Sequence, residues 1–199
     1  MSEYKFINNE SDLCEKFAQE GNLKKLIDCY NSGRNPLTAN TFHEACINNN
    51  TEMMIWLHIN KCPFDPWTAA IVGGKNGNLE ILEWFLLNGY IIDDLTYAKA
   101  CESGKIEVLE WLKEKNIKPD SNGFAATHAS FAGHIYVLEW LITNNHIIEE
   151  HSTKNAAFGD QLETLKYLVY NHIPWSKNDC LKMAIRNKNN EMIEWIKLQ

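Results

Sequence analysis

Several features are absent from this 199-residue chain, and each absence excludes a class of protein. No stretch approaches the roughly 20 consecutive apolar residues that a membrane-spanning helix needs, so we expect no membrane contact. Met1 to Lys5 form no apolar signal segment, so we expect an intracellular, cytoplasmic protein. Only two of the 19 basic residues are arginine, and 26 acidic residues bring the formal charge to −7. That balance argues against nucleic acid as a partner, because nucleic-acid binding requires a basic surface.

Patterns typical of disulfide frameworks, metal sites and catalytic centres are also absent. The six cysteines are scattered, with no CxxC pair, and we expect an intracellular chain to keep them reduced. The seven histidines share no recurring partner, and there is no Gly-rich phosphate loop, HExxH motif or nucleophile elbow. We therefore expect no catalytic residue, no metal and no cofactor. A metal-binding protein or enzyme that uses the dispersed His and Cys side chains remains an alternative.

The chain does contain an internal repeat. One aromatic position recurs at spacings of 28, 27, 29, 27 and 28, occupied by Trp56, Trp84, Trp111, Trp140, Tyr167 and Trp195. Apolar residues flank it in every unit, and a unit centred on Asp28 fits the same template. A fixed period of this size indicates a repeat architecture. We expect one domain over residues 1–199, with units at about 11–37, 38–65, 66–93, 94–120, 121–149, 150–176 and 177–199.

Each unit is expected to form two helices joined by a tight turn. Ile81, Leu82, Phe85 and Leu86 have the spacing of one helix face. Seven residues before the aromatic, a left-handed turn is predicted at Gly21, Gly77, Gly104 and Gly133. The following position is a good N-cap for the second helix where it is Asn22, Asn50, Asn78 or Asn189.

The first helix of each unit is expected to be shorter. It carries small residues at packing positions, which are Ala45-Cys46, Gly73-Gly74, Ala100-Cys101 and Ala156-Ala157. Thr41, Thr68, Thr96 and Ser152 lie near its start and are expected to cap it. A leucine-rich repeat of similar period is excluded, because no unit has its alternating LxxLxL strand.

Two segments carry a family resemblance. Residues 77–84 (GNLEILEW) and 133–140 (GHIYVLEW) resemble the GHxxVV core of ankyrin repeats, and the Leu-Glu-Trp-Leu signature looks most like the ankyrin-type repeats of amoeba-infecting giant DNA viruses. The resemblance implies an all-α, ankyrin-like helical solenoid of about seven repeats. The TPLH motif is absent and the units fall short of the usual ~33 residues, so the hairpin fingers are expected to be shortened or absent.

The resemblance also implies a function. It implies a non-catalytic module that binds a protein partner through its concave face, and a viral protein that engages host factors in the host cytoplasm. A structural solenoid that assembles with itself, as part of a virion or scaffold, remains the alternative; otherwise we expect a monomer. In ankyrin architecture the two residues before the turn glycine point toward partners.

Those positions give the candidate site. Carried over by position, the pairs are Gln19-Glu20, Ile47-Asn48, Lys75-Asn76, Glu102-Ser103, Phe131-Ala132, Phe158-Gly159 and Arg186-Asn187. Phe131 and Phe158 are aromatic and in register, with His128 and Asn155 one helical turn earlier. Exposed paired aromatics flanked by polar groups are typical of a binding hot spot. We therefore predict partner-binding residues Phe131, Phe158, His128, Asn155, Lys75, Glu102 and Arg186. The alternative is that both rings are buried between units.

Other conspicuous side chains are expected to be structural. The recurring tryptophans are expected to pack between neighbouring units, because buried aromatic rings dominate the stability of such interfaces. A column of glutamates, Glu83, Glu110, Glu139 and Glu194, is expected to form a solvated outer ridge. Phe64, Trp67 and Trp175 near the loop tips are expected to pack over the next unit's first helix, with a second partner surface as the alternative.

Overall fold

The computed structural model describes residues 13–33, 35–119 and 123–199, without the side chains of residues 66–69. The described residues form fourteen α-helices and no strand, which confirms the all-α expectation for this part of the chain. The helices are α1 (Leu13–Gln19), α2 (Leu23–Asn31), α3 (Ala39–Ile47), α4 (Thr51–Ile59), α5 (Pro66–Asn76), α6 (Leu79–Leu87), α7 (Asp94–Glu102), α8 (Ile106–Glu114), α9 (Phe124–Ala132), α10 (Ile135–Thr143), α11 (Glu150–Phe158), α12 (Leu162–Tyr170), α13 (Lys177–Asn187) and α14 (Asn190–Leu198).

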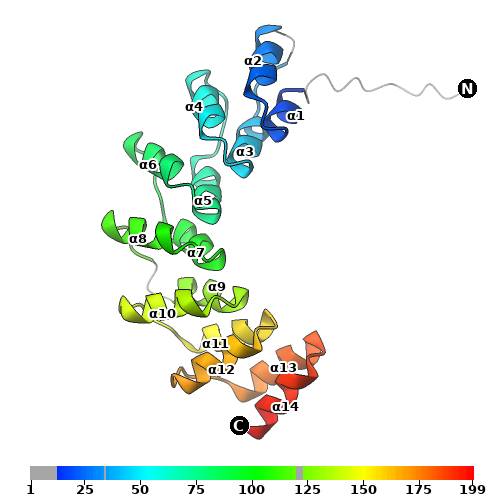
Figure 1. The fold of residues 1–199 in the computed structure, drawn as a ribbon, viewed down its shortest axis with the longest axis vertical. Helices are drawn as coiled ribbons and strands as arrows, with labels where there is room; N and C mark the ends of the chain where they lie inside the picture. The colour runs from blue at the N-terminus through cyan, green and yellow to red at the C-terminus, as the bar shows by residue number, and fades with distance from the viewer. Residues whose placement is uncertain (1–12, 34, 120–122) are drawn as a thin grey trace, which may run out of the picture.

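The helices stack as consecutive pairs in one curved row (Figure 1). The odd-numbered helices, which come first in each pair, line the concave side of the row. Consecutive first helices pack directly on one another from α1 to α13. Their facing positions hold small residues, among them Ala45, Ala100 and Ala156, which are fully buried. The second helices carry the recurring aromatic column of Trp56, Trp84, Trp111, Trp140, Tyr167 and Trp195. We therefore attribute the curvature to closer approach along the first helices.

Left-handed residues end the first helix of every pair. The turn residues are Gly21, Asn49, Gly77, Gly104, Gly133, Asp160 and Lys188, with φ between 56° and 82°. The four predicted glycine turns are therefore confirmed, and three units use a non-glycine residue in the same conformation. Glycine adopts this conformation without the steric cost that a β-carbon imposes.

The second helices begin as the sequence predicted in four units. The side chains of Asn22, Asn50, Asn78 and Asn189 each accept a hydrogen bond from the backbone N–H three residues ahead.

The prediction of which residues cap the first helices was wrong for two residues, Thr96 and Ser152. Thr38 and Asp93 are the caps of α3 and α7, whereas the hydroxyls of Thr96 and Ser152 are buried without a hydrogen-bond partner. Thr41 joins Thr38 in a capping box, and the side chain of Thr68 lies outside the described part of the chain.

The tryptophan column packs between neighbouring units, as expected. Trp56 and Trp84 make edge contacts with rings of the preceding second helix, at 5.6 Å from Tyr30 and 4.7 Å from His58. Trp111 and Trp140 instead donate indole hydrogen bonds to Glu83 and Glu110, again on the preceding second helix. The glutamates of the expected outer ridge are exposed, apart from Glu83, which is half-buried. Glu83 and Glu110 have a further role that was not expected, because the stacking of units brings each carboxylate to an indole N–H.

The loop aromatics are partly buried rather than free. Phe64 stacks on Phe42 of α3, in its own unit, with ring centroids 4.2 Å apart. The ring centroid of Trp175 lies 6.0 Å from that of Trp195 on α14, so Trp175 contacts the second helix of the next unit. The side chain of Trp67 lies outside the described residues.

Candidate functional site

One residue per unit, two positions before each left-handed turn residue, forms what we call the inner column. It lies at or beside the C-terminal end of each first helix and comprises Gln19, Ile47, Lys75, Glu102, Phe131, Phe158 and Arg186. Because first helices pack side by side, column residues of adjacent units become neighbours in space. The column therefore turns residues about 28 positions apart into one continuous surface.

Phe131 and Phe158 lie side by side in this column. Their ring centroids are 5.6 Å apart at an interplanar angle of 37°, and the side chains are 39% and 38% exposed. The alternative in which both rings are buried between units is therefore excluded. The guanidinium of Arg186, in the next unit, lies 4.8 Å from the Phe158 ring centroid. A cation in this position is attracted by the ring's quadrupole and covers one of its faces.

Gly159 allows the two rings to approach. It directly follows Phe158, and a β-carbon built on it would overlap the carbonyl oxygen of Phe131. Its φ is not positive, so close packing is the reason for glycine here. The aromatic pair thus depends on the backbone of α11 lying against the end of α9.

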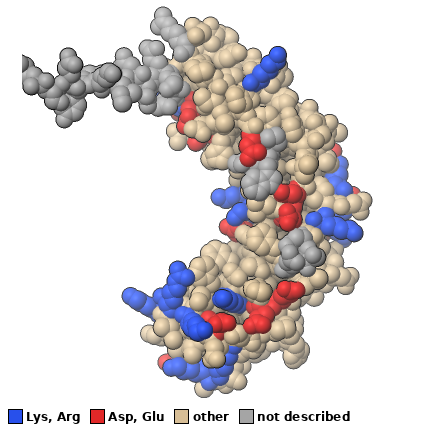
Figure 2. Space-filling view, turned by 180° about the vertical axis from the view of Figure 1, so that it is seen from behind, with Lys and Arg blue, Asp and Glu red and all other residues tan. Residues whose placement is uncertain are grey.

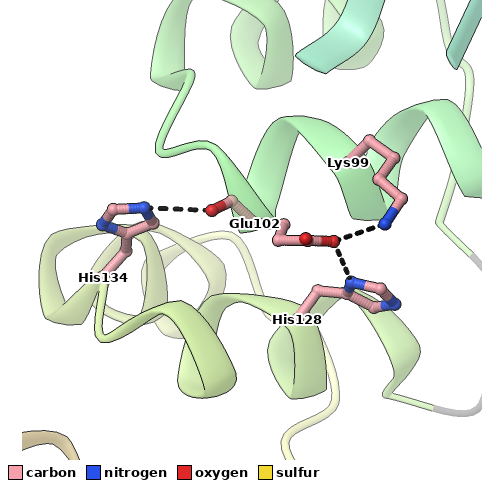
Figure 3. Close-up of polar contacts among 4 residues, drawn as sticks. All are labelled: Lys99, Glu102, His128 and His134. Atoms are coloured by element: carbon pink, nitrogen blue, oxygen red, sulfur yellow. Dashed lines mark hydrogen bonds and ion pairs between the residues drawn. The ribbon is translucent and has the colours of Figure 1, made fainter. Parts of the chain in front are cut away.

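A polar cluster joins the end of α7 to α9, the helix that carries Phe131. Figure 3 shows its four residues, Lys99, Glu102, His128 and His134. The Glu102 carboxylate accepts hydrogen bonds from Lys99 Nζ at 2.6 Å and from His128 Nδ1 at 2.7 Å. The Nε2 of His134 donates to the Glu102 backbone oxygen at 3.1 Å. Partial burial acts to raise the pKa of the Glu102 carboxyl, but the bonds from Lys99 and His128 outweigh it and the pKa is lowered.

Two predicted residues are not part of these contacts. Asn155 donates its side-chain amide to the backbone oxygen of His151 within α11, at 2.9 Å. Lys75 is exposed on α5, and α7 separates it from the helix that carries Phe131. The structure therefore brings together five of the seven predicted residues, in two adjoining groups: Phe131, Phe158 and Arg186, and Glu102 with His128.

Three asparagines expected to face a partner instead join units to one another. The side-chain amides of Asn48, Asn76 and Asn187 each donate to the last two carbonyls of the preceding first helix, at distances of 2.8–3.3 Å. Helix C-termini leave carbonyls without intrahelical partners, and these amides satisfy them. These asparagines do not face a partner because the carbonyls at the end of one first helix lie within reach of the asparagine at the end of the next first helix.

Sequence reasoning missed Lys99, Phe124 and His134. Phe124 is 39% exposed, with its ring 4.5 Å from that of His128. The spacing of Phe124, His128 and Phe131 on α9 is i, i+4, i+7, a single helix face, and this signal could have revealed the stripe. Lys99 stands three residues before Glu102, a spacing at which helical side chains meet. His134 follows the turn glycine and gave no comparable signal.

A hollow lies between the ends of α8 and α10, away from the inner column. It has a volume of about 440 Å³ and is lined by Tyr97, Lys113, Asn116, Ile117, Lys118, Pro119, Asn144, Asn145, His146 and Ile147. His146 Nε2 lies 3.1 Å from the hydroxyl of Tyr97, and burial together with nearby Lys113 lowers the pKa of this imidazole.

No group of three or more His, Cys, Asp or Glu side chains in the described residues could hold a metal ion.

Comparison with known proteins gives no family assignment. No protein-family model matches the chain, and no curated protein sequence matches it. Within the described part of the chain, no helix is long and apolar enough to cross a membrane.

Proposed function

We propose that this chain is a non-catalytic, ankyrin-like repeat module that binds a protein partner through the surface of its first helices, centred on Phe131 and Phe158. One observation carries this proposal: two phenylalanines at the same position of adjacent units contact each other on the surface. Both residues are almost two-fifths exposed, although Ala129, Ala156 and Ala157 on the same two helices are fully buried.

The energetics favour a partner at this position. Helices α9 and α11 pack on each other and already contain fully buried alanines, and the exposed parts of the two rings lie outside any buried contact. Complete burial of a phenylalanine side chain stabilises by about 1.5–3 kcal/mol relative to full exposure. A partner that covers both rings would recover the remaining part of that free energy at one spot, which is how interface hot spots act.

The charges beside the rings indicate what the partner offers. Arg186 covers a face of Phe158 and has no ion-pair partner among the described residues, so its N–H groups can receive a carboxylate. Lysine and arginine side chains gather at the C-terminal end of the molecule (Figure 2). We therefore propose a partner segment with apolar side chains over the phenylalanines and an acidic residue toward Arg186. From the resemblance to viral ankyrin-type repeats, we propose a host protein as its source.

The test compares two double variants with the wild type. Phe131→Asp/Phe158→Asp places carboxylates in the proposed site. Leu87→Asp/Ile91→Asp is the matched control, because these apolar residues are 77% and 78% exposed and lie at the end of α6 and in the loop after it. Circular dichroism first establishes that all three proteins are folded. Partners are then captured from lysate, identified by mass spectrometry, and their affinities measured with purified components.

We expect the Phe131→Asp/Phe158→Asp variant to bind the identified partner at least about 30-fold more weakly, the cost of losing a hot spot. The control should bind like the wild type. Equal binding by all three proteins would place the interface elsewhere. If no partner is captured and light scattering shows a mass that rises with concentration above 23.0 kDa, self-assembly replaces partner binding as the function.

A further inference from the structure

Two cysteine thiols meet inside the first helix pair. Cys14 on α1 and Cys29 on α2 are 15 residues apart, and their Sγ atoms lie 3.5 Å from each other. Both are free thiols. A disulfide bond requires about 2.05 Å between sulfurs, so a movement of roughly 1.5 Å would suffice. Among the described residues, none of the other four cysteines has a second thiol within hydrogen-bond distance.

The repeat template does not require sulfur at either position. In the other units the position of Cys29 is held by Leu57, Phe85, Leu112, Leu141, Leu168 and Ile196. The position of Cys14 is held by Phe42, Ala70, Tyr97, Ala126, Thr153 and Leu181. Only the first unit has cysteine at both. Ordinary packing would explain a single buried cysteine, because cysteine behaves as a small apolar residue. Two thiols in contact are, in addition, able to react with each other.

The two thiols have different access to solvent. Cys14 is fully buried; burial, together with the hydrogen bond that it donates to Cys29, raises the pKa of its thiol to about 12. Cys29 is half-buried and lines an open groove of about 350 Å³ with Lys25, Asp28 and Ser32. A small oxidant therefore reaches Cys29 first.

We propose that Cys14 and Cys29 form a reversible disulfide when the protein meets a small hydroperoxide. The Cys29 thiolate attacks the peroxide, forming a sulfur–oxygen bond and releasing an alcohol or, from hydrogen peroxide, water. Cys14 sulfur then attacks Cys29 sulfur and forms the disulfide, and the hydroxyl group leaves as water with the Cys14 proton. In total, two thiols are oxidised and one peroxide is reduced. A dithiol reductant reverses the modification.

The bond would hold α1 to α2. In the described chain the helix pair α1–α2 has a neighbouring helix pair on one side only. Such terminal units open more readily than units that are packed on both sides. A cross-link over 15 residues removes much of the freedom of the opened pair. Oxidation is therefore expected to stabilise this end of the row without changing the surface around Phe131.

Peptide mapping tests this directly on the wild-type chain. Reduced protein is treated with hydrogen peroxide, the remaining thiols are alkylated, and trypsin is applied without reductant. Cleavage after Lys16, Lys25 and Arg34 places the two cysteines on separate peptides. We expect these two peptides to be linked, with the mass of two hydrogens lost, and to separate after dithiothreitol. If both cysteines are instead alkylated, or if Cys29 reaches the sulfinic acid unlinked, the proposal is wrong.

Variants and hydrogen exchange give independent readouts. Cys14→Ala and Cys29→Ala should each abolish the linked peptide, and Cys180→Ala, at a buried thiol without a thiol partner, should leave it unchanged. In the oxidised wild type, amides of α1 and α2 should exchange about tenfold or more slowly than in the reduced protein. Unchanged exchange in a protein shown to be linked would overturn the stabilising role.

Discussion

At the scale of single residues, the surface near α9 is organised by a few charged groups. Glu102 accepts from two basic side chains at once, and Arg186 lies over an aromatic ring instead of pairing with a carboxylate. Each group is partly exposed, so water screens its interactions and limits their contribution to stability. The main effect of these contacts is to fix the orientation of side chains around the phenylalanine pair.

The lowered pKa of Glu102 predicts a pH dependence. A carboxyl whose pKa is lower in the folded state contributes stability above its ordinary pKa of 4.5, and this contribution is lost as the pH falls through the lowered value. We expect Glu102→Gln to reduce the free energy of unfolding by about 0.5–1 kcal/mol at pH 7. The difference should shrink as the pH falls through the lowered pKa and disappear once the wild-type carboxyl is protonated. Urea denaturation across this range measures the difference.

Glu114→Gln serves as the control for this measurement. Glu114 is exposed on α8 and has no ion-pair partner among the described residues. Its replacement should leave stability unchanged at every pH. A constant deficit of Glu102→Gln from pH 7 to pH 3 would show that Glu102 acts through packing, contrary to the charge-based explanation.

At the scale of secondary-structure elements, close approach of first helices determines which residues are tolerated. Gly73 and Gly74 are adjacent on α5 but face different surroundings. A β-carbon on Gly74 would lie 2.7 Å from Thr96 Cγ2 and 2.8 Å from the Thr96 backbone oxygen on α7. On Gly73 it would meet only side-chain atoms of Leu82 and Ile81, at 3.1 and 3.2 Å. The prediction that this pair marks a close helix contact is confirmed, and Gly74 makes the tighter contact.

These neighbours provide a matched pair of substitutions. Gly74→Ala should destabilise the protein by about 2 kcal/mol, because a backbone oxygen cannot move aside without separating α5 from α7. Gly73→Ala should stay within about 1 kcal/mol of the wild type, because its side-chain neighbours can shift and alanine favours helix over glycine by about 1 kcal/mol. Thermal and urea denaturation measure both. Equal effects would contradict the assigned helix contact.

At the scale of the whole molecule, the pairs form a row in which each first helix between α1 and α13 packs on the first helices before and after it. The helices are mostly nine residues long, about 13 Å, and isolated helices of this length are unstable in water. Each pair therefore depends on its neighbours, and stability is a sum of local terms and interfaces between adjacent units.

This dependence predicts a gradient of hydrogen exchange in the reduced protein. Amides of α7 and α9, which have pairs on both sides, should exchange most slowly. Amides of α1 and α2, and of α13 and α14, should exchange faster by about tenfold or more. Exchange followed by mass spectrometry of peptides resolves the pairs. Uniform protection across all fourteen helices of the described chain would mean that it unfolds as one unit.

The sequence by itself determined the period, the helix pairs and most of the turns. These features follow from local rules: apolar spacing selects helices, and glycine at Gly21, Gly77, Gly104 and Gly133 permits left-handed turns. Asparagine caps such as Asn50 act on a backbone N–H only three residues away. The exposure of Phe131 and Phe158 was also predictable, because position within a repeat determines which side of a helix a residue occupies.

Only the tertiary structure decided which residues of different units meet. Asn48 reaches carbonyls 29 and 30 residues earlier, Trp111 reaches Glu83, and His128 reaches Glu102. Such contacts depend on the distance and rotation between stacked pairs, which the period leaves open. The meeting of Cys14 and Cys29 likewise depends on how α1 packs on α2. Local propensity specifies each helix, whereas the side-chain volumes between helices determine how close they come.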